Sequence, residues 1–364
     1  MKKISNLCKL IIFISLTIFL INKVGEIFIP EQIYDDKGFQ GQTVTIKGYY
    51  ELPKNTLDVL FLGDSSLMKG VSPMELWNDY GIASYVFGIN WGRMYSFYYN
   101  LKDALRYQNP KLVVIDPVTL YYDHEPAESH LRVSVDYMKT SKVKLEMIND
   151  EIYNNTFEDK ISIIFPLLRY HTRWTEMTKE ELKKINKKYH SSTKGFIMVS
   201  NVKSNKLGNS YMMNEKNIKM PERYKEYLIK IIKLCKEKNI KLMIAAVQDV
   251  RVWGKTESIL LKKLCDEYGV DFYDMNNIDY GLNWKEDTSD GGGHMNVLGG
   301  MKVTKSVGTH IHNNYDLPDR RNDDAYNSWY QDYEIYRKER DILINIAQEK
   351  IAKKKLRRIV NYNN

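Results

Sequence analysis

The strongest constraint on the fold is the alternation of short apolar runs with amphipathic stretches in residues 57–116 and 222–312. The apolar runs predict five strands, at Leu57–Leu62, Ala83–Phe87, Lys111–Asp116, Lys241–Val247 and Val270–Asp274. The amphipathic stretches predict helices over Tyr95–Tyr107, Glu222–Lys238, Glu257–Tyr268 and Val297–His312. This alternation is typical of an α/β fold, a flavodoxin-like three-layer α/β/α arrangement around a five-stranded, mostly parallel sheet. Ligands of such folds bind at the carboxyl ends of the strands.

One further helix start lies between the first two strands. Ser72 is followed by Pro73 and Glu75, which predicts a helix with Ser72 as N-cap, proline at the first position and a capping box closed by Glu75.

The other segments complete the predicted organisation. Residues 117–221 are too long for an ordinary connection and contain Lys/Glu-rich helical stretches such as Thr178–Tyr189, so they predict a helical cap inserted over the strand ends. The predicted parts are 1–28 (cytoplasmic N-terminus and signal anchor), 29–116 (first part of the α/β domain), 117–221 (cap insert), 222–315 (second part) and 316–364 (an arm, then a basic helix from Tyr326 to Val360).

The N-terminus has the pattern of a membrane anchor. Lysines precede and follow the uncharged run Leu10–Asn22, whose length fits a signal peptide better than a full span of about 20 residues. Lysines that flank such a run can snorkel and lengthen the effective span, and no small-residue cleavage pattern follows, which favours an uncleaved anchor. More lysines precede the run than follow it, so we expect a single-pass protein of the cell membrane with a cytoplasmic N-terminus and an extracytoplasmic body.

The net charge of +8 lies at the two ends of the chain, and the body between residues 24 and 344 is close to neutral. This distribution argues against a nucleic-acid partner. The basic run 350–358 would face anionic lipid headgroups or wall polymer outside the cell. The three cysteines are too few and too far apart for a disulfide framework or a zinc site. We therefore expect no metal and no other cofactor.

Two loops carry residues suited to nucleophilic catalysis. Ser65 follows Gly63 and Asp64 directly after the first strand, so its hydroxyl lies at a strand end and its N–H at the start of a helix. His294 lies in the glycine-rich loop after the fifth strand, with Asp290 upstream to orient its imidazole as a general base. Both loops are expected at the same edge of the sheet.

These two blocks resemble the SGNH/GDSL hydrolase superfamily, which has Gly-Asp-Ser after its first strand and Asp-x-x-His before its last helix. The resemblance covers residues 57–116 and 222–312. It implies that Ser65 is the nucleophile and His294 the base, and that the N–H groups of Ser65 and Gly88 form an oxyanion hole.

The chain departs from the superfamily pattern in two places. The third block, Gly-x-Asn-Asp, is missing after the third strand, which leaves Asn90 as a substitute oxyanion donor. Gly291 stands where the last block has its acid, so the triad acid is Asp290 as first choice and Asp287 as second.

Within the superfamily the chain is similar to the membrane-anchored proteins that act beside membrane-bound O-acyltransferases in alginate acetylation and teichoic-acid D-alanylation. The resemblance implies acyl-enzyme chemistry on O-acyl groups, such as acetyl, of a cell-surface polysaccharide. Hydrolysis of such esters with water as the acceptor, and a non-catalytic role as partner of the acyltransferase, remain alternatives. In the insert, Tyr170, His171, Arg173 and Trp174 could bind sugar or brace the cap.

Overall fold

A computed structural model of the chain describes residues 2–31, 41–122, 128–179, 181–206, 208–213, 215 and 218–362. The chain forms two compact units. The first joins residues 1–32 to 126–189, and the second joins 33–125 to 190–364. Residues 190–221 of the predicted cap insert thus belong, by their contacts, to the unit that contains the sheet.

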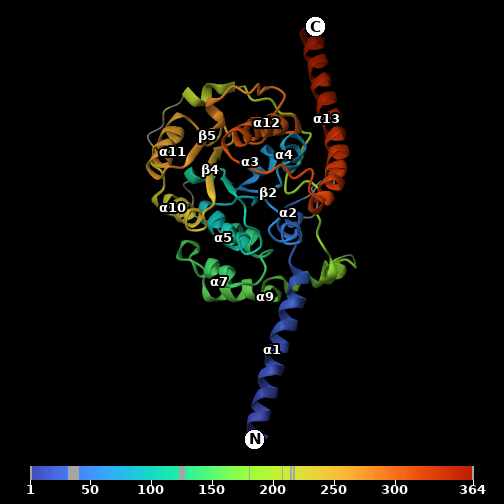
Figure 1. The fold of residues 1–364 in the computed structure, drawn as a ribbon. Coiled ribbons are helices and arrows are strands. Elements are labelled where there is room, and N and C mark those ends of the chain that lie inside the picture. The colour runs from blue at the N-terminus through green and yellow to red at the C-terminus, as the bar shows by residue number, and fades with distance from the viewer. Residues whose placement is uncertain are drawn as a thin grey trace. The chain divides into compact units, whose positions relative to one another are not determined.

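The second unit is built on one five-stranded sheet (Figure 1). Its strands are β1 (Val59–Gly63), β2 (Ser84–Gly88), β3 (Leu112–Ile115), β4 (Lys241–Ala246) and β5 (Asp271–Asp274). They lie in the order β2-β1-β3-β4-β5 and every neighbouring pair is parallel. Every residue of β1, β2 and β3 is buried, as expected for a parallel sheet covered on both faces. The predicted α/β fold is confirmed, and each predicted strand lies within two residues of an observed one.

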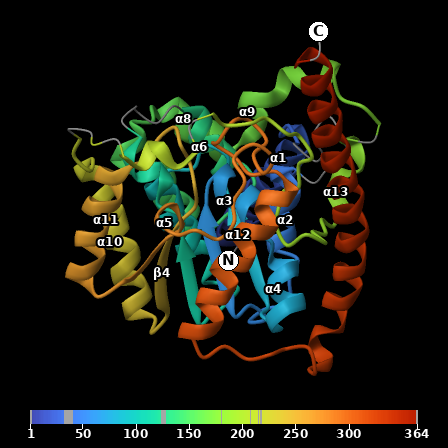
Figure 2. The same ribbon diagram turned by 90° about the horizontal axis from the view of Figure 1, so that it is seen from above.

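Helices cover both faces of this sheet (Figure 2). One face carries α5 (Met94–Ala104), α10 (Glu222–Glu237) and α11 (Lys255–Tyr268), and the other carries α3 (Ser65–Gly70), α4 (Pro73–Tyr80) and α12 (Val297–Asn314). Two further helices are α2 (Gln42–Tyr49), which packs beside β2, and α13 (Asn327–Tyr362), which packs on α4 and α12. The strand order reverses direction at β1, so the switch point of the sheet lies at the carboxyl ends of β1 and β3, where ligands of such folds bind.

The turn from β1 into α3 depends on a glycine and a capping aspartate. A Cβ on Gly63 would lie 2.7 Å from Leu67 Cδ2 and 2.9 Å from Asp116 Cβ, so only glycine allows α3 and the end of β3 to come this close. Asp64 is the N-cap of α3, and its carboxylate accepts a hydrogen bond from the Ser66 N–H at 2.8 Å. Together they place Ser65 at the first position of the helix.

The start of α4 follows the prediction in part. Ser72 caps the helix by accepting from the Glu75 N–H, and Pro73 is its first residue. The Glu75 carboxylate does not close the predicted capping box. It accepts from Tyr336 Oη at 2.9 Å and from Arg340 Nη1 at 2.5 Å, both on α13. A charged partner on a packed helix outweighs the local backbone N–H as a hydrogen-bond donor.

The basic end of α13 also has partners within the chain. Lys350 Nζ donates to the Ser200 carbonyl at 3.1 Å, Lys354 donates to the Val202 carbonyl, and Lys355 pairs with Glu286 at 2.7 Å. These contacts occupy three of the lysines that the sequence suggested would face lipid or polymer.

In the first unit, α1 (Lys2–Phe28) is one continuous helix. Within residues 6–28, an 18-residue stretch has a mean hydropathy of 2.1, so this helix is long and apolar enough to cross a membrane. The other α-helices in the described part of this unit are α6 (Glu128–Val135), α7 (Lys142–Asn149), α8 (Phe157–Ile164) and α9 (Pro166–Tyr170). α9 packs on α1 near Gly25, where a Cβ would lie 2.9 Å from the Leu167 nitrogen.

The helix predicted over Thr178–Tyr189 is wrong in the part that the structure describes. That part holds a 3₁₀ helix at Glu181–Asn186, and Glu180 lies outside the described residues. Four of the nine residues after Glu180 are lysines, and the side chain of Leu182 is exposed, so little packing supports a longer α-helix there. The other 3₁₀ helices are Val118–Tyr121, Glu151–Tyr153, His171–Thr175, Gly208–Met213, Met275–Asn277 and Asp324–Tyr326.

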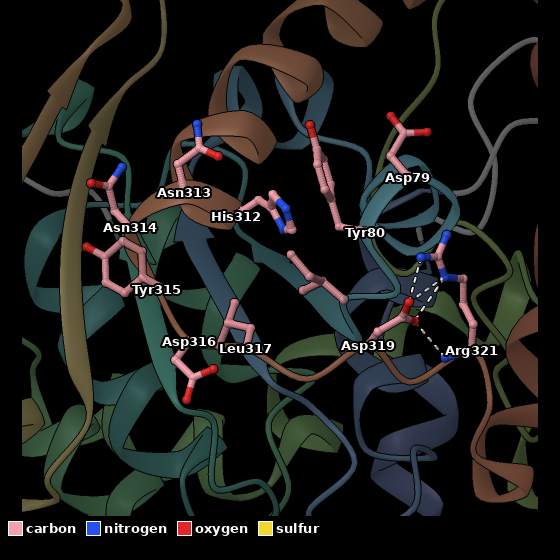
Figure 3. A pocket seen from close by; sticks show the side chains of 11 residues that line it. Asp79, Tyr80, His312, Asn313, Asn314, Tyr315, Asp316, Leu317, Asp319 and Arg321 are labelled. Carbon is pink, nitrogen blue, oxygen red and sulfur yellow. Dashed lines mark hydrogen bonds and ion pairs between the residues drawn. The ribbon is translucent and has the colours of Figure 1, made fainter.

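A polar hollow of about 630 Å³ lies at the C-terminal end of α12 (Figure 3). The rings of Tyr80 and His312 stack at 4.9 Å on its wall, and Asp319 pairs with Arg321 at 2.5 Å on its rim. The 18 residues of α12 separate this hollow by roughly 27 Å from the loop that contains His294, so it is not part of the site described next.

Candidate active site

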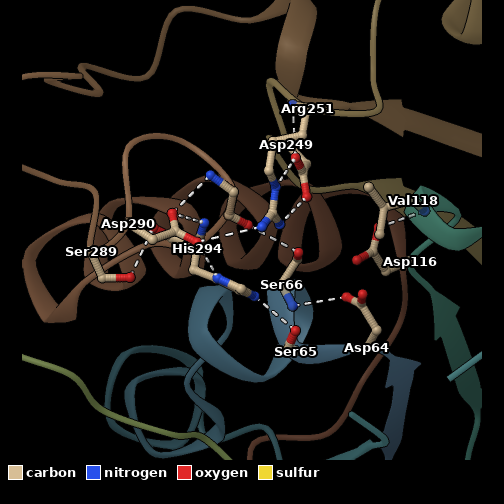
Figure 4. Close-up of polar contacts among 11 residues, drawn as sticks. Asp64, Ser65, Ser66, Asp116, Val118, Asp249, Arg251, Ser289, Asp290 and His294 are labelled. Atoms are coloured by element: carbon tan, nitrogen blue, oxygen red, sulfur yellow. Dashed lines mark hydrogen bonds and ion pairs between the residues drawn. The ribbon is translucent and has the colours of Figure 1, made fainter. Parts of the chain in front are cut away.

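Ser65, His294 and Asp290 form a continuous series of hydrogen bonds at the carboxyl edge of the sheet (Figure 4). Ser65 Oγ lies 2.8 Å from His294 Nε2, and His294 Nδ1 lies 2.6 Å from Asp290 Oδ2. The carboxylate requires a proton on Nδ1, which leaves Nε2 free to accept the Ser65 hydroxyl proton. The structure therefore brings together the three residues that the sequence selected first, in an order suited to activating a serine.

The loop before α12 wraps around the Asp290 carboxylate. Asp290 Oδ1 accepts from the N–H groups of Gly293 and His294, each at 3.0 Å. Gly291 and Gly292 have φ values of +99° and +119°, which glycine adopts at little cost. Three residues separate Asp290 from His294, one more than in Asp-x-x-His. The turns at Gly291 and Gly292 accommodate this extra residue, so that Asp290 still reaches His294.

Asp290 has a depressed pKa. Partial burial alone would raise it, but the hydrogen bonds and charge of His294, with a smaller contribution from Arg251, outweigh burial and hold the pKa of Asp290 below its usual range. The carboxylate thus stays ionised and can stabilise an imidazolium at His294.

This depressed pKa predicts a pH-dependent contribution to stability. An unfolded aspartate titrates near pH 3.9, so the contribution is fully present above about pH 5 and is lost as the pH falls below that value. We expect the free energy of unfolding of Asp290→Asn to fall less than that of the wild type between about pH 6 and pH 3. Urea unfolding of the full chain in detergent measures the free energy of unfolding of both proteins at each pH. Equal losses of unfolding free energy in the wild type and in Asp290→Asn would contradict the depressed pKa. The Asp290 side chain is 35% exposed, so solvent screening makes the effect modest.

Asp287, the second choice for the acid, has another role. Its side chain is buried, and its Oδ2 accepts from the Asn283 N–H at 2.6 Å and pairs with Lys302 Nζ at 2.7 Å. Its carbonyl accepts from the Asn296 N–H at 2.9 Å. These bonds fasten the base of the loop to α12.

Gly88, predicted with Ser65 to form the oxyanion hole, is the last residue of β2, and the substitute donor Asn90 follows two residues later. The Ile89 N–H donates to the Gly63 carbonyl at 2.9 Å, which joins the ends of β1 and β2. Gln42 spans the turn that follows, since it donates to the Gly88 carbonyl and accepts from the Asn90 N–H, both at 2.7 Å. A Cβ on Gly88 would lie 2.0 Å from Met68 Cγ, so glycine lets α3 pack against β2. The oxyanion role of these residues stays a prediction.

Sequence reasoning missed a group of buried acids around the nucleophile (Figure 4). Asp64, Asp116 and Asp249 follow β1, β3 and β4, and all three are buried. Burial raises the pKa of Asp116 well above its usual value, with the Asp64 charge adding to the effect, and burial also raises the pKa of Asp64. The rule that selected Ser65, a polar residue just after a strand, would have found them.

The four insert residues singled out from the sequence lie in the first unit. Tyr170 Oη donates to Asp136 Oδ2 at 2.6 Å, and Arg173 donates to the Phe28 carbonyl at 2.5 Å and pairs with Glu181. His171 and Trp174 are exposed. Tyr170 and Arg173 thus have bracing contacts, and sugar binding by this set remains a prediction.

Comparison with known proteins adds little. No family model matches the chain, and no curated protein matches it. A crystal structure from Bacteroides fragilis, of a protein described as a "putative acylhydrolase", is 12% identical with a TM-score of 0.35, and covers 74% of this chain and 93% of that one. These values are too low to assign a function.

Proposed function

We propose that the chain is a serine hydrolase or acyltransferase of the SGNH/GDSL type, with Ser65 as nucleophile, His294 as base and Asp290 as the residue that orients the base. The observation that carries the proposal is the hydrogen-bonded series from Ser65 Oγ through His294 to Asp290. This arrangement is recognised by its geometry rather than by its place in a sequence.

The reaction would proceed through an acyl-enzyme. Ser65 Oγ attacks the ester carbonyl carbon while His294 Nε2 takes the hydroxyl proton, and His294 then returns that proton to the departing alkoxide. The acyl group remains on Ser65 Oγ until water or a second hydroxyl attacks it, with His294 taking the proton of the attacking group. The bond between the acyl carbon and Ser65 Oγ then breaks, and His294 returns the proton to Ser65 Oγ. We assign stabilisation of the tetrahedral oxyanion to the N–H groups of Ser65 and Gly88, at about 3 kcal/mol for each donor.

The substrate and the setting follow from the N-terminal helix and the resemblance. If α1 anchors the chain with its N-terminus in the cytoplasm, Ser65 lies on the cell exterior, where small O-acyl groups such as acetyl decorate polysaccharides. We propose that its substrates are O-acyl groups on a cell-surface polysaccharide and that its partner is a membrane-bound O-acyltransferase. Tyr170, His171, Arg173 and Trp174 would contribute to glycan binding.

Covalent labelling tests this function directly. We expect the full chain in detergent to gain the mass of one fluorophosphonate adduct, and the adduct to be absent from Ser65→Ala. Ser66→Ala is the matched control, because Ser66 Oγ donates to the Gly293 carbonyl at 3.1 Å and not to His294. A folded wild-type protein that takes no adduct would contradict the proposal and favour the non-catalytic partner. Release of acetate, compared with its transfer to an added oligosaccharide, then separates hydrolysis from transfer.

A further inference from the structure

We propose that Arg251, which follows β4, is a positioning residue that holds the triad acid Asp290 in register with His294. The inference rests on the proposed function. The other parts of the site come from the ends of β1 and β2 and from the loop after β5. Arg251 adds the end of β4 to them.

The first observation is that Arg251 is held in place independently of Asp290. Asp249 is completely buried, and its Oδ1 accepts from both the backbone N–H and the Nε–H of Arg251, each at 2.9 Å. Its Oδ2 accepts from Arg251 Nη2 at 2.6 Å. Such a two-pronged pair fixes the plane of the guanidinium as well as its position.

The second observation is that the remaining edge of the guanidinium faces the triad (Figure 4). Arg251 Nη1 lies 3.5 Å from Asp290 Oδ2, the same oxygen that accepts from His294 Nδ1. The loop N–H groups hold only Oδ1, so Arg251 supplies a second, charged contact that sets the rotation of the carboxylate about its Cβ–Cγ bond.

The third observation is that the loop backbone lies directly against the guanidinium. A Cβ on Gly293 would fall 1.9 Å from Arg251 Cζ, and the Val250 N–H donates to the Gly292 carbonyl at 3.1 Å. Residues 250 and 251 therefore support the loop at the point where it is one residue longer than the Asp-x-x-His pattern.

The charges explain why the arginine comes with its own aspartate. A lone arginine beside Asp290 would cancel the negative charge that stabilises an imidazolium at His294. Asp249 neutralises Arg251, so the pair orients Asp290 while leaving its charge available to His294. A lysine could supply the charge but not the flat two-pronged contact.

The test compares rates of fluorophosphonate labelling in the full chain. We expect Arg251→Ala to react about 10²-fold more slowly, because a displaced catalytic group costs about that much. Its melting temperature should fall, because the buried Asp249 carboxylate loses its charged partner, so labelling is measured well below that temperature. We expect Arg251→Lys to recover part of the rate. The guanidinium is half exposed, so millimolar guanidinium chloride should accelerate Arg251→Ala, whereas sodium chloride at equal ionic strength should not.

Two controls keep the test decisive. Arg337→Ala removes a surface arginine paired with Glu334 and should label at the wild-type rate. Gly293→Ala keeps the charges of Arg251 and Asp290 but displaces the Arg251 guanidinium. It should therefore label slowly, and added guanidinium ion should not accelerate it. This variant replaces Arg251→Ala in the test if Arg251→Ala does not fold. Wild-type labelling of Arg251→Ala, or slow labelling that neither lysine nor guanidinium improves, overturns the positioning role. Failure of the wild type itself to label would instead reject the proposed function.

Discussion

Replacement of His294 by alanine is expected to slow labelling of Ser65 by about 10⁶-fold. His294 Nε2 is the group placed to take the proton of Ser65 Oγ. In the described part of the chain, no other base within hydrogen-bond distance of Ser65 Oγ can replace it. The fold should tolerate the change, because the backbone bonds of residue 294 to Asp290 and Ser289 remain. The measurement is the labelling rate together with the melting temperature.

A second histidine on the same unit gives the matched control. His312 stacks on Tyr80 at the far end of α12, and His312→Ala should therefore label as fast as the wild type. If His294→Ala is folded and still labels at the wild-type rate, His294 is not the base and the triad is excluded.

The two aspartates of the loop should behave in opposite ways. We expect Asp290→Asn to lower the labelling rate by about 10⁴-fold, because an amide can hold the imidazole in the wrong tautomer and cannot stabilise an imidazolium. Asp287→Asn should label at nearly the wild-type rate. It should lose about 1–3 kcal/mol of unfolding free energy, because it weakens buried bonds to Lys302 and the Asn283 N–H.

Urea unfolding and labelling rates on the two variants separate these effects. The informative result is a slow Asp290→Asn that loses little stability, together with a fast Asp287→Asn that loses more. The reverse pairing would transfer the role of the acid to Asp287.

The sheet and the placement of the two catalytic loops could be predicted because they depend on patterns within short segments. Burial on both faces makes each strand a short apolar run, and the rule on strand ends then places Ser65 and His294 at one edge. The choice between Asp290 and Asp287 could not be made from spacing alone. It depends on how Gly291 and Gly292 turn the loop, with φ values that a sequence pattern does not specify.

Other features could not be predicted because they depend on contacts between distant segments. Glu75 has the right spacing for a capping box, but Arg340, 265 residues later in the chain, provides the stronger donor. Arg251 has no local motif, and its relation to Asp290 exists only because β4 lies beside β5 in the sheet. Gln42 likewise has no local motif. It contacts the end of β2 from a helix that the sequence analysis did not predict.

The separation of Ser65 from its base has a consequence for the time at which the chain acquires reactivity. The hydrogen bond that joins them spans 229 residues, and the strands β2, β3, β4 and β5 all lie in the intervening sequence. Contacts of such high sequence separation form late, after the entropy of closing the chain has been overcome. A nascent or incompletely folded molecule therefore lacks this hydrogen bond, and under the proposed function Ser65 would become reactive only when the sheet is complete.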